Sequence, residues 1–370
     1  MLSERKNIEI KVFYSWGENS LKKYDPGFGR VIEWDIPLLE GYQYEFLENS
    51  SKKPGSHHYQ GIINPYLKQQ INTWNPDALL VIGWNYHSHL QALQFFHGRL
   101  PILFRGDSTL LDEQSGWRKI ARRIALNWVY RHVDIALYAG SANKRYFEAH
   151  GLKEKQLVFA PHAVDNERFV DNEIRRYSER ALAWRREIGF SDIDIVLLFA
   201  GKTEPVKNPL FLLKSIQLYN SFHPKKLKAI FVGNGSMENK LKKMAFSDAN
   251  IRFLDFQNQT QMPVVYRLGD IFCLPSRSET WGLSVNEAMA CGKSVLVSDH
   301  CGCAADLVKT GKNGFIFQSE NHDDFAEKIN SLCKQGTEGL VQLGAKSKTF
   351  IQSWSMECLT ESITSTIQSF

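Results

Sequence analysis

The amino-acid sequence predicts an α/β protein with two doubly wound domains. Three observations support this fold class. Short, nearly continuous apolar segments alternate with helix-like stretches, as expected for parallel strands that are buried on both faces. The 370 residues are sufficient for two domains of ordinary size. Residues 164–190 contain no strand pattern and separate two sets of such apolar segments.

The first domain is expected to span residues 1–165. Its predicted strands are Ile8–Tyr14, Ala78–Gly83, Ile102–Arg105, Ile135–Tyr138 and Leu157–Ala160. Residues 166–190 are interpreted as a linker and a surface helix, because the stretch from Arg175 to Arg186 is rich in charge.

The second domain is expected to span residues 191–351. Its predicted strands are Ile195–Ala200, Lys228–Val232, Ile251–Leu254, Ile271–Leu274 and Ser294–Val297. A C-terminal helix, at residues 352–370, is expected to pack back on the first domain. Because ligands of doubly wound sheets bind at the carboxyl ends of the strands, we expect a site in a cleft across which the two domains face each other.

Composition excludes several classes of protein. The net charge of +5 is small for this length and gives no support to a nucleic-acid partner. The six cysteines form no CxxC pair, so we expect reduced thiols and a cytoplasmic protein. Residues 1–7 do not begin a secretory signal, and no apolar run approaches the ~20 residues that a membrane-spanning helix needs.

The strongest chemical pattern lies between Leu274 and Phe317. A predicted strand is followed by a turn that ends at Gly282, and a helix is expected from Leu283 to Ala290. Glycine at the turn lets the backbone approach a ligand closely. The free amides and the positive dipole end at the start of the helix suit a diphosphate.

Two carboxylates, Glu279 and Glu287, bracket this helix start with seven residues between them. A carboxylate can accept two hydrogen bonds, which suits the vicinal hydroxyls of ribose or a hexose. The alternative is that Glu279 caps the helix and Glu287 is a solvated surface residue. For an isolated pair of glutamates this alternative would be favoured, but the surrounding turn, strand and helix support a ligand site.

This region resembles the signature of the large retaining GT-B glycosyltransferase family, the glycosyl transferases group 1, which includes sucrose and glycogen synthases. Its hallmark is E-x7-E followed by Ala-Met-Ala-x-Gly, here Glu279, Glu287 and the segment 288–292. The family's Gly-Arg-x4-Lys element is matched by Gly201-Lys202 and Lys207, with lysine in place of arginine. The resemblance covers roughly residues 160–318 and implies two Rossmann-like domains.

The resemblance implies a binding site for a nucleotide-diphosphate sugar. Lys202 and Lys207 would hold the diphosphate, Glu287 the ribose and Glu279 the donor sugar. The other residues implied to bind the donor are Gly201, Gly233, Phe256, Gln257, Gly282, Leu283 and Ser284. The implied catalytic residues are Glu279, Lys207, Lys202 and Asp107.

The acceptor is expected to bind to the first domain. The candidate residues follow its predicted strands or lie in the loop 25–30, and they are Gly27, Gly29, Arg30, His87, Arg105 and Asp107. Arg105 stands where many relatives have a histidine. Asp107 either binds acceptor or sugar hydroxyls or caps the next helix.

No metal and no cofactor are expected apart from the nucleotide sugar as co-substrate. Asp192-Ile193-Asp194 has the form of a metal-binding DxD motif. It enters a predicted strand at the amino end, which is the wrong edge of the sheet for the site, so we interpret it as a surface turn.

Residues 114–133 contain five basic residues and no acidic residue. Trp117, Ile120, Ile124 and Trp128 recur at helical spacing, which predicts a basic amphipathic helix. One interpretation is a crossover helix that packs on its sheet with a solvated basic face. The other is peripheral contact with anionic lipid on the inner face of a membrane, as a lipid-linked acceptor would require.

The expected function is retaining sugar transfer to a glycan, lipid-linked or small-molecule acceptor, in polysaccharide or glycoconjugate synthesis. Two alternatives remain at this point. A nucleotide-sugar 2-epimerase has the same layout, and it would alter the sugar without any acceptor. A non-catalytic sugar-nucleotide binder would bind the donor and release no product.

Overall fold

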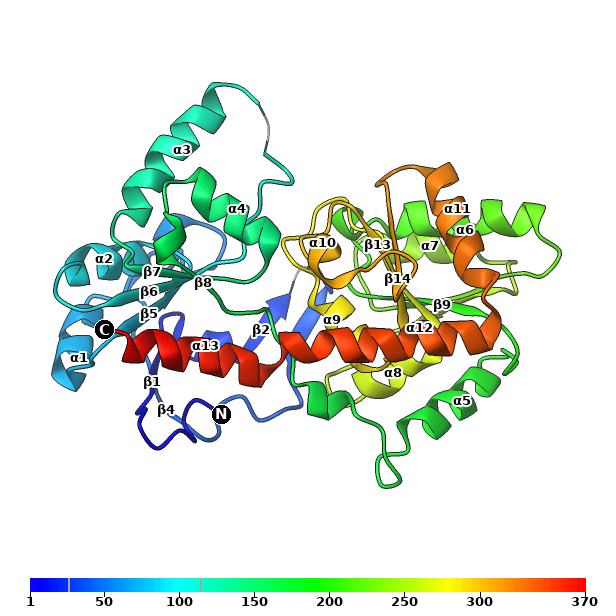
Figure 1. The fold of residues 1–370 in the computed structure, drawn as a ribbon, viewed down its shortest axis with the longest axis horizontal. Coiled ribbons are helices and arrows are strands. Elements are labelled where there is room, and N and C mark those ends of the chain that lie inside the picture. Colours follow the sequence, from blue (N-terminus) through cyan, green and yellow to red (C-terminus); the bar gives the residue numbers. More distant parts are fainter. Residues whose placement is uncertain (26, 114) are drawn as a thin grey trace. The chain divides into compact units, whose positions relative to one another are not determined.

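The computed structural model describes residues 1–25, 27–113 and 115–370. Pro26, in the predicted loop 25–30, and Gln114, in the predicted basic helix, lie outside the described residues. The chain divides into two compact units, each of which is described by itself (Figure 1). Unit 1 comprises Met1–Lys23, Pro37–Pro161 and Glu357–Phe370, and unit 2 comprises Tyr24–Ile36 and His162–Met356.

Unit 1 is built on a parallel sheet with the strand order β5-β6-β7-β8. These strands are Leu79–Ile82, Ile102–Arg105, Ile135–Tyr138 and Leu157–Phe159. A separate parallel pair is formed by β1 (Lys11–Tyr14) and β4 (Gln43–Phe46). The helices are α1 (Leu67–Trp74), α2 (His87–Phe96), α3 (Trp117–Tyr130) and α4 (Ser141–Ala149). The short 3-10 helices are η1 (Gly17–Ser20), η2 (Tyr59–Gly61) and η3 (Glu154–Gln156).

The C-terminal helix α13 (Met356–Gln368) lies almost entirely in unit 1. Its Ile363 is buried in one apolar cluster with Leu103, Leu137 and Ala160. Hydrophobic burial therefore holds the end of the chain against strands that lie more than 200 positions earlier in the sequence.

Unit 2 is built on a six-stranded parallel sheet with the order β11-β10-β9-β12-β13-β14. The strands are β9 (Val196–Ala200), β10 (Lys228–Val232), β11 (Ile251–Leu254), β12 (Ile271–Leu274), β13 (Ser294–Ser298) and β14 (Gly314–Phe317). Along β9, Val196 and Leu198 join one core cluster while Leu197 and Phe199 join another. Successive strand residues point to opposite faces, so both faces of this sheet are buried. This explains why its strands are continuously apolar in the sequence.

Helices cover both faces of the sheet in unit 2. They are α5 (Tyr177–Glu187), α6 (Pro209–Phe222), α7 (Glu238–Met244), α8 (Met262–Leu268), α9 (Leu283–Ala290), α10 (Ala304–Leu307), α11 (His322–Cys333) and α12 (Gly336–Phe350). The short 3-10 helices are η4 (Asn166–Phe169), η5 (Pro205–Lys207) and η6 (Ile351–Trp354).

A segment of the N-terminal sequence belongs to unit 2. Strands β2 (Lys22–Asp25) and β3 (Arg30–Glu33) pair with each other, and residues 24–36 pack within unit 2. Asn258 Nδ2 donates to the carbonyl oxygen of Glu33 at 2.8 Å, and the Thr260 amide donates to Asp35 at 3.1 Å. The sequence placed this segment in the first domain, because nothing local in it indicates contacts with residues 225 positions away.

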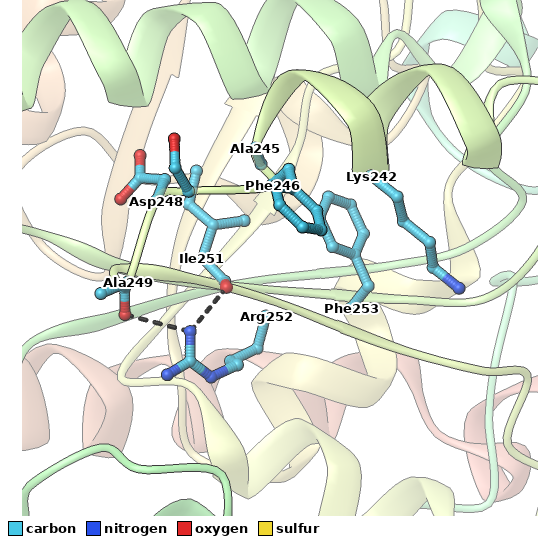
Figure 2. A pocket seen from close by; sticks show the side chains of 9 residues that line it. Lys242, Ala245, Phe246, Asp248, Ala249, Ile251, Arg252 and Phe253 are labelled. Atoms are coloured by element: carbon cyan, nitrogen blue, oxygen red, sulfur yellow. Dashed lines mark hydrogen bonds between the residues drawn. The ribbon is translucent and has the colours of Figure 1, made fainter.

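An open hollow of about 450 Å³ lies between the end of α7 and the start of β11 (Figure 2). It is lined by Phe246, whose ring is exposed, and by Arg252, which donates to the carbonyl oxygens of Ala249 and Ile251 at 3.0 and 2.9 Å. It lies at the amino end of β11 and contains none of the predicted site residues.

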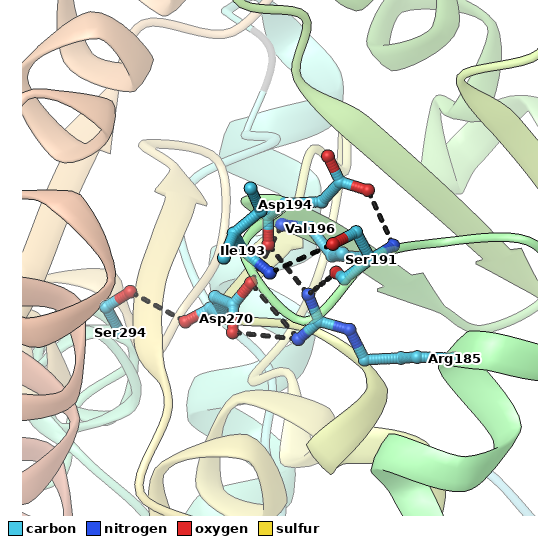
Figure 3. A network of polar contacts seen from close by, with 7 residues as sticks. All are labelled: Arg185, Ser191, Ile193, Asp194, Val196, Asp270 and Ser294. Atoms are coloured by element: carbon cyan, nitrogen blue, oxygen red, sulfur yellow. Dashed lines mark hydrogen bonds and ion pairs between the residues drawn. The ribbon is translucent and has the colours of Figure 1, made fainter.

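Helix α5 is fixed to the sheet by the buried Arg185 (Figure 3). Its guanidinium donates to Asp270 Oδ1 at 3.1 Å and to the carbonyl oxygen of Asp194 at 2.7 Å. Asp270 in turn accepts the amide of Val196 at 2.9 Å. The charge of Arg185 is thus paired and hydrogen-bonded, which buried charge requires.

Within the described residues, none of the helices combines the length and the apolar composition that crossing a bilayer would need. All six cysteines are free thiols, and four of them, Cys273, Cys291, Cys301 and Cys303, are buried.

Candidate functional site

The predicted donor residues of unit 2 lie in loops that follow the carboxyl ends of neighbouring strands, except Leu283, Ser284 and Glu287, which lie in α9. The loops after β10, β9 and β12 contain Gly233, Lys202 with Lys207, and Glu279, respectively. These three strands are adjacent in the sheet. Parallel strands end at the same edge, so the fold gathers the loops on one side of unit 2.

Lys207 and Glu279 form an ion pair between Nζ and Oε2. Lys207 ends the short helix η5, and Glu279 lies in the turn after β12. The amide of Glu279 donates to the carbonyl oxygen of His300 at 3.1 Å, and the amide of Gly302 donates to the carbonyl oxygen of Glu279 at 2.9 Å. Backbone bonds to the loop after β13 thus fix the position of this carboxylate. The structure brings together two residues that the sequence singled out separately.

The start of α9 depends on Gly282. Its φ of +105° lies in the region that side chains other than glycine rarely adopt, and a Cβ there would lie 2.7 Å from Leu274 Cδ2. The buried Trp281 donates from Nε1 to Asn286 Oδ1 at 2.9 Å, and Asn286 Nδ2 donates to the carbonyl oxygen of His162 at 2.8 Å. These bonds hold the helix end that presents the first amides, those of Leu283 and Ser284.

The loops after β9 and β10 touch through their glycines. Gly233 has φ +120°, and a Cβ there would lie 2.2 Å from the carbonyl oxygen of Gly201. The Thr203 amide donates to the carbonyl oxygen of Asn234 at 3.0 Å. Asn234 Oδ1 accepts the amide of Phe256 at 2.8 Å, which connects this pair of loops to the loop after β11. The predicted glycines are therefore needed for packing between the loops.

Lys202 is paired with Asp25, which sequence reasoning missed as a site residue. Lys202 Nζ lies 2.9 Å from Asp25 Oδ2 and 5.1 Å from the centroid of the Phe28 ring. Burial alone would raise the pKa of Asp25, but hydrogen bonding and charge from Lys202, with the amides of Gly27 and Phe28, hold this pKa below its ordinary value. No signal in the sequence relates positions 25 and 202.

Phe256 is covered by the segment 24–36. Its ring centroid lies 4.9 Å from that of Phe28, and the Arg30 guanidinium lies 5.2 Å from it. Gln257 follows and donates to the carbonyl oxygen of Asp255 at 3.1 Å. The structure thus places Gly27, Gly29 and Arg30, which the sequence assigned to the acceptor, in a segment that packs against the residues expected to bind the donor.

Glu287 is held by protein groups inside unit 2. Tyr266 donates its hydroxyl to Glu287 Oε2 at 2.5 Å, and Arg168 Nη2 lies 3.5 Å from Oε1. Burial raises the pKa of Glu287 although both neighbours favour the charged form. The side chain is 14% exposed, so the interpretation of Glu287 as a solvated surface residue is wrong. Tyr266 and Arg168 come from α8 and η4 and carry no motif of their own.

Two of the candidate acceptor residues, Arg105 and Asp107, lie in unit 1 at and after the end of β6. Arg105 donates from Nη1 to the carbonyl oxygen of Ala160 at 2.8 Å and from Nη2 to that of Pro161 at 2.9 Å. Asp107 is exposed, and it does not cap the next helix, because α3 begins at Trp117 after Gly116. The capping interpretation of Asp107 is therefore wrong.

His87 and His89 lie at the start of α2. His87 Nε2 is 3.3 Å from Gln91 Nε2, and its ring is 5.8 Å from that of Tyr59. His89, which the sequence analysis missed, lies 2.9 Å from Ser15 Oγ and 3.1 Å from the carbonyl oxygen of Gly83, and burial lowers its pKa.

The Asp192-Ile193-Asp194 sequence lies in the turn before β9. Asp192 is exposed and paired with Arg186, and Asp194 accepts the amide of Ser191 at 2.8 Å. In the part of the chain that the structure describes, three or more His, Cys, Asp or Glu side chains do not come together in an arrangement that could hold a metal ion.

Part of the sequence is similar to sequences of known proteins. Residues 181–350 match the model of the family Glycosyl transferases group 1. A D-inositol 3-phosphate glycosyltransferase of Rhodococcus erythropolis is 31% identical over 47% of this chain and 41% of the relative. A GDP-mannose-dependent monoacylated alpha-(1-6)-phosphatidylinositol monomannoside mannosyltransferase of Corynebacterium glutamicum is 25% identical over 69% of this chain and 67% of the relative. The chain thus spans about two fifths of the length of the first of these relatives.

Solved structures of similar fold cover most of the chain. Anabaena HepE, in complex with UDP and glucose, superposes with a TM-score of 0.67 at 19% identity, over 89% of this chain and 87% of HepE. Sucrose-phosphate synthase of Thermosynechococcus elongatus superposes with a TM-score of 0.71 at 13% identity, over 98% of this chain and 88% of the synthase. The chain therefore has the GT-B fold.

Proposed function

Because residues 181–350 match the model of the Glycosyl transferases group 1 family, we propose that the chain transfers a sugar from a nucleotide-diphosphate-sugar donor to a hydroxyl group of an acceptor. The observation that carries this proposal is the Lys207–Glu279 ion pair in the loops beside the start of α9. It places a cation suited to a diphosphate next to a carboxylate suited to sugar hydroxyls.

In this proposal the donor changes the partners of both lysines. Lys202 and Lys207 are each neutralised by a carboxylate, Asp25 and Glu279. A diphosphate would bind the two ammonium groups and the amides of Leu283 and Ser284, since anions are favoured at a helix N-terminus. Glu279, separated from Lys207, would then accept hydrogen bonds from hydroxyls of the donor sugar.

The nucleoside would bind between Phe256-Gln257 and Glu287. Glu287 accepts Tyr266 with Oε2, which leaves Oε1, 3.5 Å from Arg168, as the oxygen for a ribose hydroxyl. Phe28 and Arg30 both contact the Phe256 ring, so the segment 24–36 would contribute to donor binding. We therefore assign Gly27, Gly29 and Arg30 to donor binding in the proposal.

The transfer is proposed to retain the anomeric configuration. The acceptor oxygen attacks the anomeric carbon from the face on which the diphosphate leaves. The bond from this carbon to the phosphate oxygen breaks, the new carbon–oxygen bond forms, and the acceptor's proton passes to the departing phosphate. In the complex with the donor, Lys202, Lys207 and the α9 amides are in position before the bonds change, and they stabilise the negative charge that develops on the diphosphate.

For the acceptor, we propose a glycan, lipid-linked or small-molecule hydroxyl that binds to unit 1 near His87 and Asp107. Arg105 contributes by bracing the carbonyl oxygens of Ala160 and Pro161. We place the reaction in the cytoplasm, in polysaccharide or glycoconjugate synthesis, because all six cysteines are free thiols. The Corynebacterium glutamicum relative, named for a phosphatidylinositol mannoside, makes lipid-linked glycans the first acceptors to test.

The test begins with thermal shift of the purified chain against UDP, GDP and ADP and their sugars, starting from UDP-glucose and GDP-mannose. The best donor is then incubated with candidate acceptors, and NMR of the product determines the anomeric configuration. A product with an inverted anomeric centre would contradict the retaining mechanism. Release of an altered sugar without any acceptor would identify a 2-epimerase, and donor binding without any product would identify a sugar-nucleotide binder.

A further inference from the structure

Helix α3 (Trp117–Tyr130) exposes a stripe of large apolar side chains on the surface of unit 1. The stripe consists of Trp117, Ile120, Ile124 and Trp128. Trp117 is 74% exposed and Ile124 is 67% exposed. Single apolar residues on a surface are ordinary, but four that follow one another along one helix form a contiguous patch.

Packing of α3 on its own unit does not account for this stripe. The helix is anchored by Leu126, Val129 and Tyr130, which are buried in the core of unit 1. An α-helix turns about 100° per residue, so these three residues and the stripe lie on opposite sides of α3. Helix α3 therefore has two apolar faces. One packs on the core of unit 1, and the other is exposed on the opposite side of the helix. The interpretation as a packed crossover helix explains only the first of these faces.

Cations border the stripe at its two ends. The guanidinium of Arg118 lies 5.7 Å from the Trp117 ring, and that of Arg131 lies 5.8 Å from the Trp128 ring. The other basic residues of the segment are engaged with the protein. Lys119 and Arg123 pair with Glu113, and Arg122 donates to the Tyr146 hydroxyl at 3.1 Å. Residues 115–131 contain no acidic residue that would oppose an anionic surface.

We propose that this face of α3 docks unit 1 on an anionic lipid surface. Tryptophan rings at the two ends of the stripe suit the headgroup region, and the isoleucines between them suit the boundary of the acyl chains. Arg118 and Arg131 would bind lipid phosphates. A second copy of the chain fits less well, because a symmetric pairing would bring these arginines of both copies into one interface.

This inference concerns a surface outside the donor site and does not depend on the proposed reaction. It does suit an acceptor that resides in a membrane. The residues that carry it are all part of unit 1, and none of them is assigned to sugar transfer.

The first experiment is flotation of the full chain with vesicles of phosphatidylcholine alone and with added phosphatidylglycerol. We expect binding to the anionic vesicles, weaker binding as salt increases, and a blue shift of tryptophan fluorescence. In the double variant Ile120→Glu and Ile124→Glu, binding should weaken about tenfold or more, because two charges enter the apolar boundary. The matched control is Ile174→Glu with Ile193→Glu, two exposed isoleucines of unit 2, which should leave binding unchanged.

The second experiment tests the charge. Arg118→Gln with Arg131→Gln should weaken binding to anionic vesicles by about fivefold for each arginine removed. Circular dichroism and thermal unfolding verify that every variant is folded. Equal binding to neutral and anionic vesicles, or equal loss in the control pair, would overturn the proposal. A dimer in light scattering that the Ile120 and Ile124 substitutions dissociate would also overturn the proposal, if neither the wild type nor any variant binds vesicles.

Discussion

Lys202 and Lys207 lie in the same loop and are each neutralised by a carboxylate from another part of unit 2. The spacing of the sequence indicated both lysines and Glu279, because these positions belong to recognisable local patterns. Asp25, Tyr266 and Arg168 could not be found in the same way. Their partners lie 177, 21 and 119 positions away, and only the folded chain makes them neighbours.

The role of Lys207 can be tested by Lys207→Ala. If this ammonium stabilises the leaving diphosphate, kcat should fall by about 100-fold or more. The pair with Glu279 is partly buried, with the Lys207 and Glu279 side chains 26% and 15% exposed, so the melting temperature should fall slightly while the variant remains folded. Steady-state kinetics with the donor found by thermal shift provides the measurement. Lys242→Ala, which removes a lysine paired with Glu238 in the same unit, is the control. Near-normal turnover of Lys207→Ala would remove the diphosphate role.

The pair of Asp25 with Lys202 should make stability depend on pH. The pKa of Asp25 is lower in the folded chain than its ordinary value, so the ionised carboxylate favours folding. This stabilisation is complete above the ordinary value of about 3.9 and is lost as pH falls through the folded pKa. The difference in unfolding free energy between the wild type and Asp25→Asn should therefore be constant near neutral pH and shrink in acid. Urea denaturation over a pH series measures it, and a difference that grows in acid would contradict the assignment.

At the scale of elements, the sequence predicted strands well where they are buried on both faces. Strands β9 to β13 have nearly the predicted bounds, because a continuous apolar run has few other solutions. It did not predict β14, which is an edge strand of the sheet in unit 2. It also did not predict β2, β3 or β4, which are short and carry exposed polar residues such as Lys22, Arg30 and Gln43. Their pairing comes from tertiary contacts, which local patterns do not encode.

Helix α5 looks like a charged surface helix in the sequence, yet one of its arginines is structural. Arg185 is buried and paired with Asp270, whereas its neighbour Arg186 is exposed and paired with the exposed Asp192. Arg185→Ala should destabilise the protein by about 3 kcal/mol, because it leaves the partly buried carboxylate of Asp270 without its buried partner. Arg186→Ala should leave the stability almost unchanged, because an ion pair that is open to solvent contributes little. Urea denaturation of both variants compares them directly, and equal costs would contradict the structural role of Arg185.

For the whole molecule, the sequence predicted two doubly wound domains, and the chain has the GT-B fold. The composition of the two units was less accessible. Unit 2 consists of two separate stretches of chain, because residues 24–36 pack within it. A division of the sequence into consecutive domains cannot assign residues 24–36 to unit 2, because residues of unit 1 precede and follow them.

This composition predicts that an N-terminal substitution affects the ligand response of unit 2. A nucleoside diphosphate at 100 times its Kd should stabilise the chain by about 2.7 kcal/mol. Phe28→Ala removes a ring that contacts Phe256, so the increase in Tm caused by the nucleotide should be smaller in this variant. Tyr24→Ala, which removes an exposed ring from the same segment, is the control. Thermal shift with and without nucleotide measures both, and an equal response in the two variants would refute the prediction.

The segment 24–36 also has a consequence for synthesis on the ribosome. Its hydrogen bonds join Glu33 and Asp35 to Asn258 and Thr260, which are made 225 residues later. At about 5–20 residues per second, these partners follow after roughly 10–45 s. Throughout that interval Phe28 and Trp34 lack Phe256, the ring against which they pack, and the four strands of the unit 1 sheet are made within the same interval. The nascent chain therefore completes unit 2 around β2 and β3, which leave the exit tunnel before the other strands of that unit.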